Sequence, residues 1–344
     1  MPLRSAPFSS CSRNETRPLA DSSSSTLRPS IVSALLSGVL LNCAFLAILR
    51  GHSLLVKAGL GSFSQDLLVL FGLLEVRQKS PMFDLSLFRI PTFAGAQITA
   101  FAISAGMFAQ FLFLSIYLEN VIGNSAVRTG VIFLPLSLVS FVVAPLAGRF
   151  SARFPVRWFL GGGLALTGVA LLLMHGLTLS STASALVPGF VIGGIGVGMV
   201  NAPLAATAVS VVAPQRAGMA SGINNTFRQV GIATGIAALG AIFQSRITAH
   251  LATTRMGSQL GPIDLHAWSQ AIASGNTSYQ PNAFGDVHQL PSVNEVVAAE
   301  SSFIAGLNSI LLVAAFVLFA GAILAFFLIR EKDFVASGPA VAGH

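Results

Sequence analysis

Residues 303–329 read FIAGLNSILLVAAFVLFAGAILAFFLI and contain no charged side chain. A helix needs about 20 apolar residues to cross the hydrocarbon core of a bilayer, and this run is long enough to do so. The run is also continuous, whereas a strand of a membrane barrel would alternate apolar and polar residues with a period of two. This stretch therefore predicts a transmembrane helix.

The composition of the whole chain agrees with a membrane protein. Its 344 residues are 53% hydrophobic and 9% charged, with a mean hydropathy of +0.78. A soluble domain carries about 25% charged residues, so a soluble enzyme, a disordered chain and a disulfide scaffold are excluded. The two cysteines, Cys11 and Cys43, have no metal-binding spacing.

Seven further apolar runs have a length suited to a bilayer. They cover residues 31–49, 58–76, 93–118, 130–147, 158–176, 186–209 and 223–243. The second run is weak because Ser62, Ser64, Gln65 and Asp66 interrupt it. The runs together predict an all-α integral membrane protein with about eight transmembrane helices.

Basic residues lie singly between these runs, and they predict the orientation of the chain. With the N-terminus inside, 14 Lys and Arg residues fall in inner segments and 5 in outer segments, in agreement with the positive-inside rule. We therefore expect both termini in the cytoplasm and the chain in the plasma (inner) membrane. We also expect cytoplasmic tails at 1–28 (disordered) and 333–344, and an outer loop at 244–302 that is partly ordered at best. Scattered basic residues do not form a nucleic-acid groove, so no nucleic-acid partner is expected.

Polar side chains inside transmembrane helices commonly mark a transport pathway. The candidates are Asp66, Gln97, Gln110, Asn201, Asn224, Asn225, Arg228 and Gln229. Asp66 is the only acidic residue that could lie well within a span. It either carries a proton through a raised pKa or lies near the outer headgroups.

The roles of the two glutamines and of Arg228 also allow two interpretations each. Gln97 and Gln110 are 13 positions apart and face differently on a straight helix. Each forms either a hydrogen bond between packed helices or a ligand contact. Arg228 is either an anchor at the inner surface or a hydrogen-bonding group near Asn224 and Asn225.

A glycine-rich segment lies in the run 186–209. A phosphate-binding loop would follow a strand, whereas these glycines lie inside one apolar span. Their spacing of four residues instead predicts close helix packing, and the residues are Gly189, Gly193, Gly194 and Gly198. Hydrolase, Walker and metal-binding motifs do not occur in the sequence, so we expect neither an enzyme nor a cofactor or metal site.

Two inner segments carry a more specific resemblance. PLAGRFSARFPVR at 145–157 resembles the inner loop in the second half of major facilitator superfamily transporters. PQRAGMASGINNTFRQ at 214–229 resembles a stretch of the fourteen-helix drug:proton antiporters of the EmrB/QacA type, and 71–88 resembles the linker into their C-terminal bundle. The motif residues are Gly148, Arg149, Arg153, Arg157, Arg216, Gly218, Ser221 and Gly222.

The resemblance covers residues 71–329 and implies a function. It implies two central linker helices at 29–80 and a six-helix transporter bundle at 81–332, with no counterpart of the family's first bundle. The expected activity is proton-coupled efflux of lipophilic or cationic compounds, with membrane lipid, a small lipophilic substrate and protons as partners. Such a half would pair with a second copy of itself or with a separate N-terminal half. The alternative is a membrane fragment or assembly partner that does not transport.

Overall fold

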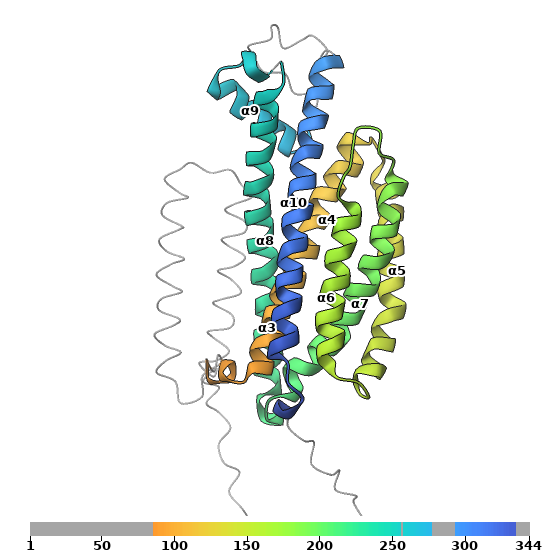
Figure 1. Cartoon of the computed structure of the whole chain (residues 1–344), viewed down its shortest axis with the longest axis vertical. Coiled ribbons are helices and arrows are strands. Elements are labelled where there is room, and N and C mark those ends of the chain that lie inside the picture. The colour runs from red at the N-terminus through yellow and green to blue at the C-terminus, as the bar shows by residue number, and fades with distance from the viewer. Residues whose placement is uncertain (1–84, 256, 277–292, 335–344) are drawn as a thin grey trace, which may run out of the picture. The chain divides into compact units, whose positions relative to one another are not determined.

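The computed structural model describes residues 85–255, 257–276 and 293–334 (Figure 1). Within these residues six helical segments are long and apolar enough to cross a membrane. They are Pro91–Val121, Ala126–Ser151, Val156–Met174, Ala183–Ser210, Pro214–Thr253 and Val293–Leu328. The predicted all-helical fold is confirmed, and the runs at 31–49 and 58–76 lie outside the described residues.

The first of these segments is not one uniform helix. It consists of α3 (Pro91–Ile103), a π-helical turn (Ser104–Phe108), α4 (Ala109–Ile116) and a second π-helical turn (Tyr117–Val121). A π-helical turn holds one residue more than a normal turn and changes the direction in which the following side chains point. The remaining helices are α5 (Ala126–Ser151), α6 (Val156–Met174), α7 (Val187–Ser210), α8 (Ala217–Thr253), α9 (Pro262–Ala273) and α10 (Val293–Leu328).

Local sequence signals explain several helix ends. Pro91 begins α3, where its missing N–H group costs nothing. The Ser125 hydroxyl accepts a hydrogen bond from the Arg128 N–H at 3.4 Å and caps α5. Gly176 follows α6 with a φ of 88°, a left-handed conformation that favours glycine and stops the helix.

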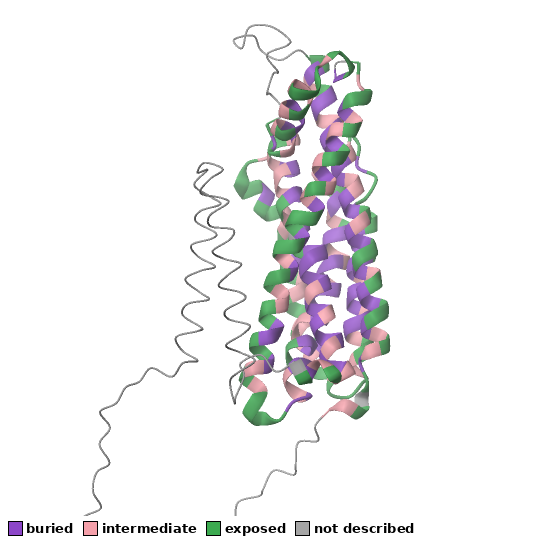
Figure 2. Ribbon diagram, turned by 90° about the vertical axis from the view of Figure 1, so that its left-hand side faces the viewer, coloured by how far each residue is buried: buried purple, intermediate pink, exposed green. Residues whose placement is uncertain are grey.

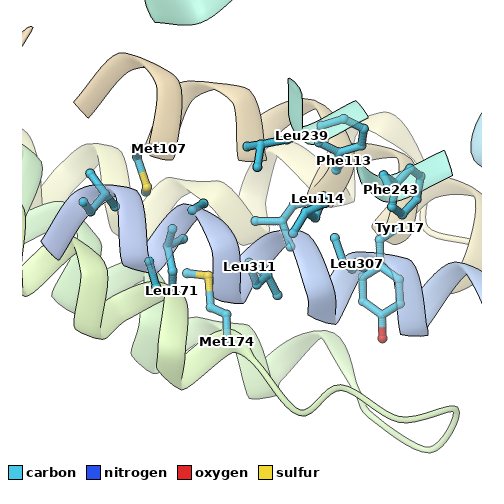
Figure 3. Close-up of a cluster of buried hydrophobic side chains, with 14 of the residues drawn as sticks. Met107, Phe113, Leu114, Tyr117, Leu171, Met174, Leu239, Phe243, Leu307 and Leu311 are labelled. Atoms are coloured by element: carbon cyan, nitrogen blue, oxygen red, sulfur yellow. The ribbon is translucent and has the colours of Figure 1, made fainter. Parts of the chain in front are cut away.

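The helices pack as one bundle. α7 packs against both α5 and α6, while α10 packs against α6, α8 and α3, and α3 packs against α8. Buried residues run along the inner faces of these helices, and exposed residues cover their outer faces (Figure 2). The core contains Phe113, Leu114 and Tyr117 beside Leu307 and Leu311 of α10 (Figure 3).

The segment 244–302, which the sequence predicts to be an outer loop that is partly ordered at best, contains helical stretches. α8 continues to Thr253, α9 forms a separate helix, and α10 already begins at Val293. α9 is held because Trp268 and Ile272 are buried and because Gln244 Nε2 of α8 donates a hydrogen bond of 2.9 Å to Ser269 Oγ. Residues 277–292 lie outside the described part.

Candidate functional site

A group of polar side chains lies where α3, α7 and α8 meet. Asn224 of α8 donates a hydrogen bond of 3.3 Å from Nδ2 to Oε1 of Gln97 in α3. Both side chains are buried, with 1% of Gln97 and 6% of Asn224 exposed. Among the described residues, Gln97 Nε2 has no hydrogen-bond partner. A buried amide donor of this kind is available for a ligand or a bound water.

Arg228 lies one turn further along α8 and contacts α7. Its Nη2 donates a hydrogen bond of 2.9 Å to Oδ1 of Asn201 in α7. Both residues are half-buried, and the pair joins α8 to α7 as Asn224 joins α8 to α3. A guanidinium has five N–H groups in a fixed fork, so the contact with Asn201 leaves further donors for another acceptor. We call Gln97, Asn201, Asn224 and Arg228 the polar junction.

The electrostatics of the polar junction follow from the sequence around it. Between Glu119 and Asp264 the chain contains no acidic residue. Helices α5 to α8 therefore offer Arg228 no carboxylate to neutralise its charge. Its contact in the junction is the neutral amide of Asn201. Such a guanidinium favours carbonyl, hydroxyl or anionic acceptors over cations. Asn225 and Gln229 are exposed on the neighbouring surface of α8.

The exposed face of α8 differs from those of the other helices. On α5 and α10 the exposed side chains are large and apolar, for example Phe141 at 80% and Phe327 at 71%. On α8 one exposed stripe, at positions 221, 225, 229, 233, 237 and 241, consists of Ser, Asn, Gln and Ala residues, and the large apolar residues exposed on this helix are Val230 at 46% and Ile236 at 37%. Large apolar faces suit lipid, while a face of small and polar residues suits a protein partner or a water-lined path.

The other glutamine has a packing role in the structure. Gln110 is completely buried, and its Nε2 donates a hydrogen bond of 3.0 Å to the carbonyl oxygen of Ile310. This contact ties α4 to α10, away from the polar junction. Asp66 lies outside the described residues.

The glycines of α7 lie at two close helix contacts. A Cβ atom added to Gly194 would lie 2.6 Å from the carbonyl oxygen of Leu136 in α5, and one added to Gly198 would lie 2.9 Å from Cβ of Val143. On the other side, a Cβ at Gly189 would lie 2.5 Å from Cγ of Met174 in α6. Gly193 is less restricted, because a Cβ atom added there would lie 3.3 Å from Cε of Met107. α7 can therefore approach both neighbours only because these positions lack side chains.

The motif residues of the two loops are mostly at the surface. Arg149, Arg153, Arg157 and Arg216 are exposed, and the Arg157 guanidinium lies 5.5 Å from the centre of the Phe326 ring. Ser221 is also exposed, while Gly148 is half-buried, and a Cβ atom added to it would lie 3.6 Å from Cβ of Ala202. A Cβ added to Gly218 or Gly222 would meet no described atom within 4 Å. The packing inside this bundle therefore does not explain the two glycines.

Two sets of contacts at the ends of the bundle were not expected from the sequence. Asn308 of α10 accepts hydrogen bonds of 3.0 Å from the N–H groups of Gly176 and Leu177, and donates one of 2.9 Å to the Leu177 carbonyl. At the other end, Thr92 Oγ1 donates to Asp333 Oδ2 at 2.8 Å. The one available signal was that Asn308 is polar within an apolar run.

Comparison with known proteins agrees with a bundle of membrane helices and assigns the chain to a family. The model of the Major Facilitator Superfamily matches residues 24–236. Multidrug resistance protein Stp of Mycobacterium tuberculosis is 31% identical over 246 residues, which are 71% of this chain and 46% of that protein. Puromycin resistance protein pur8 of Streptomyces alboniger is 33% identical over 60% of this chain and 42% of its own length.

A third relative covers slightly more of the chain. Drug efflux pump JefA of Mycobacterium tuberculosis is 29% identical over 77% of this chain and 53% of its own length. The chain thus spans about half the length of the relatives it matches. The family model matches more than half of this chain, and the described bundle is built from membrane-length helices. The chain belongs to the major facilitator superfamily.

Proposed function

We propose that the chain provides one bundle of a multidrug efflux transporter of the EmrB/QacA type and that it works together with a second bundle. Alternating access rocks two bundles against each other around a central site. The exposed stripe of small and polar residues on α8 carries this proposal, because it suits lipid less than the large apolar faces of α5 and α10 do. The names of the relatives, which include multidrug resistance and drug efflux proteins, support the class of substrate.

The polar junction supplies the polar contacts for the substrate in this proposal. Gln97 offers a free amide donor and Arg228 offers guanidinium N–H groups, so carbonyl and hydroxyl groups of a lipophilic compound would bind there. The apolar part of the compound would lie against aliphatic side chains, as in most drug-sized sites. A cationic substrate would need its negative partner from outside α5 to α8, which contain no Asp or Glu.

Proton coupling in this proposal depends on an acidic group outside the polar junction. Asp66 is the candidate within this chain, and an acidic residue of the second bundle is the other. The chain would pair with a separate N-terminal half or with a second copy of itself. Its termini would lie in the cytoplasm and its helices in the plasma membrane. Cysteine labelling at positions 25 and 337 tests this topology, and labelling of either position from outside would contradict it.

Transport by purified protein in liposomes tests the function. With an imposed proton gradient, we expect no efflux of a fluorescent lipophilic compound that carries carbonyl or hydroxyl groups from the chain alone, and efflux when an N-terminal half is co-reconstituted. Arg228→Ala should then abolish efflux, whereas Arg128→Ala at the far end of α5 should not. Proton-dependent efflux by the chain alone, abolished by Asp66→Asn, would contradict the need for a separate half and assign the coupling to Asp66.

The second candidate function is that of a membrane assembly partner without transport. It is favoured by the fact that the described helices form a single bundle, which offers one wall of a cavity. It predicts that the chain binds an N-terminal half in detergent, but that the complex shows no efflux under any proton gradient. Efflux by the complex would exclude this function.

A further inference from the structure

An apolar pocket lies at the turn between α5 and α6, and none of its lining residues belongs to the polar junction. It has a volume of about 470 Å³ and is lined by Phe150, Phe154, Pro155, Trp158, Phe159 and Met199. Three of its aromatic side chains remain open to the outside: Phe150 is 48% exposed, Phe154 58% and Trp158 56%. Of these three, Trp158 is of the residue type that is enriched at the level of the lipid headgroups.

Three arginines alternate with these aromatic residues along the chain. Arg149 precedes Phe150, Arg153 precedes Phe154, and Arg157 precedes Trp158. All three arginines are exposed. In the part of the chain that the structure describes, none of them forms an ion pair with a carboxylate, and the sequence has no acidic residue between Glu119 and Asp264. Among the described residues, these three arginines therefore give the edge of the pocket a positive charge without a carboxylate partner.

Phe326 of α10 fixes part of this arrangement. Its ring centre lies 5.5 Å from the Arg157 guanidinium and 5.0 Å from the Trp158 ring, which it meets edge to face. The cation–π contact holds a guanidinium beside the pocket at little conformational cost. On the opposite wall, Met199 of α7 is a flexible apolar side chain that can adapt to an acyl chain.

We propose that this pocket is a binding site for an anionic phospholipid. An acyl chain would occupy the aromatic pocket, and the phosphate would bind the guanidinium groups of Arg149, Arg153 and Arg157. A bidentate guanidinium–phosphate contact is among the strongest hydrogen-bonded pairs in proteins. A second protein helix fits the pocket less well, because it would have to bring several carboxylates to the same three arginines.

Fluorescence quenching of Trp158 tests the proposal. The chain has two tryptophans, so Trp268→Phe leaves Trp158 as the single tryptophan, which is excited selectively at wavelengths that tyrosine does not absorb. The full chain is reconstituted in vesicles that contain equal mole fractions of phosphatidylcholine and phosphatidylglycerol, with bromine on the acyl chains of either one or the other. We expect stronger quenching by brominated phosphatidylglycerol, with a preference of about fivefold for each arginine that contacts the lipid.

Matched variants separate this site from general surface attraction. Arg153→Gln with Arg157→Gln should remove most of the preference. Arg128→Gln with Arg246→Gln, which removes two exposed charges elsewhere, should leave it intact. Native mass spectrometry of the chain with both tryptophans, with and without the Arg153 and Arg157 changes, provides the same comparison if Trp268→Phe fails to fold. Equal quenching by both lipids, quenching by neither because a protein covers the pocket, or equal loss in both variant pairs would overturn the proposal.

Discussion

The guanidinium of Arg228 in α8 donates a hydrogen bond of 2.9 Å to the side-chain oxygen of Asn201 in α7. A hydrogen bond to a charged group contributes about 1.5–3 kcal/mol. We expect Arg228→Ala and Asn201→Ala to be non-additive in unfolding free energy, with a coupling in that range. A double-mutant cycle by chemical unfolding in detergent measures it. Arg228→Lys, which keeps the charge and loses the fork, should recover only part of the coupling. Strict additivity would show that the contact does not form.

The second prediction concerns the close contact between α7 and α5. Gly194→Ala places a methyl group 2.6 Å from the Leu136 carbonyl oxygen, so the two helices must separate. Overpacking of this kind costs about 1–3 kcal/mol, and the thermal unfolding temperature should fall. Gly222→Ala is the control, because a Cβ there meets no described atom within 4 Å, and its better helix propensity should stabilise the chain by up to about 1 kcal/mol. Equal stability of the two variants would contradict the packing role of Gly194.

The third prediction concerns the start of α3. The residue before this helix, Ile90, provides no side-chain cap. Asp333 takes this role from the far end of the chain, since its Oδ2 accepts hydrogen bonds from the Thr92 N–H at 3.3 Å and from Thr92 Oγ1 at 2.8 Å. Asp333→Ala should cost about 0.5–2 kcal/mol, as the loss of a helix cap does. Amide hydrogen exchange at residues 92–94 should become faster, while Lys332→Ala should leave it unchanged.

The fourth prediction concerns the turn after α6. Asn308→Ala removes three hydrogen bonds to Gly176 and Leu177. Asn308→Asp keeps the acceptor for the two N–H groups but loses the donor to the Leu177 carbonyl. Exchange of the amides at 176–181 should therefore be fastest in the alanine variant and intermediate in the aspartate variant. Ser309→Ala is the control, because Ser309 Oγ bonds only within α10, to the Ala305 carbonyl at 2.9 Å.

The sequence was sufficient to predict the six described membrane helices, because each coincides with a long apolar run. It did not give their full lengths. α8 continues from Phe243 to Thr253 through polar residues, since a helix can extend beyond the hydrocarbon core when a neighbour such as α9 packs against it. The buried Trp268 and Ile272 are four positions apart, and this helical spacing was the missed signal for α9.

The candidate site could be predicted only as a set of residue types. The sequence selected Gln97, Asn201, Asn224 and Arg228 because polar groups are rare in apolar spans. It could not predict that Gln97 binds Asn224, since 127 positions separate them and the pairing depends on how the helices are arranged. For Gln110, a packing contact was one of two open interpretations, and the structure places its Nε2 on the carbonyl of Ile310.

The π-helical turn at Ser104–Phe108 separates the two glutamines of the first membrane segment. Because this turn holds one additional residue, the side chains after it are rotated about the helix axis by about 100° compared with an uninterrupted α-helix. The two glutamines already face different directions on a straight helix, and in the structure Gln97 reaches α8 while Gln110 reaches α10. The π-helical turn could form at another position along the same segment. The residues between its old and its new position would then rotate about the helix axis, while the residues on either side of them would keep their orientation. A shift of this turn along the segment would thus rotate part of the helix inside a closely packed bundle without a hinge between rigid halves.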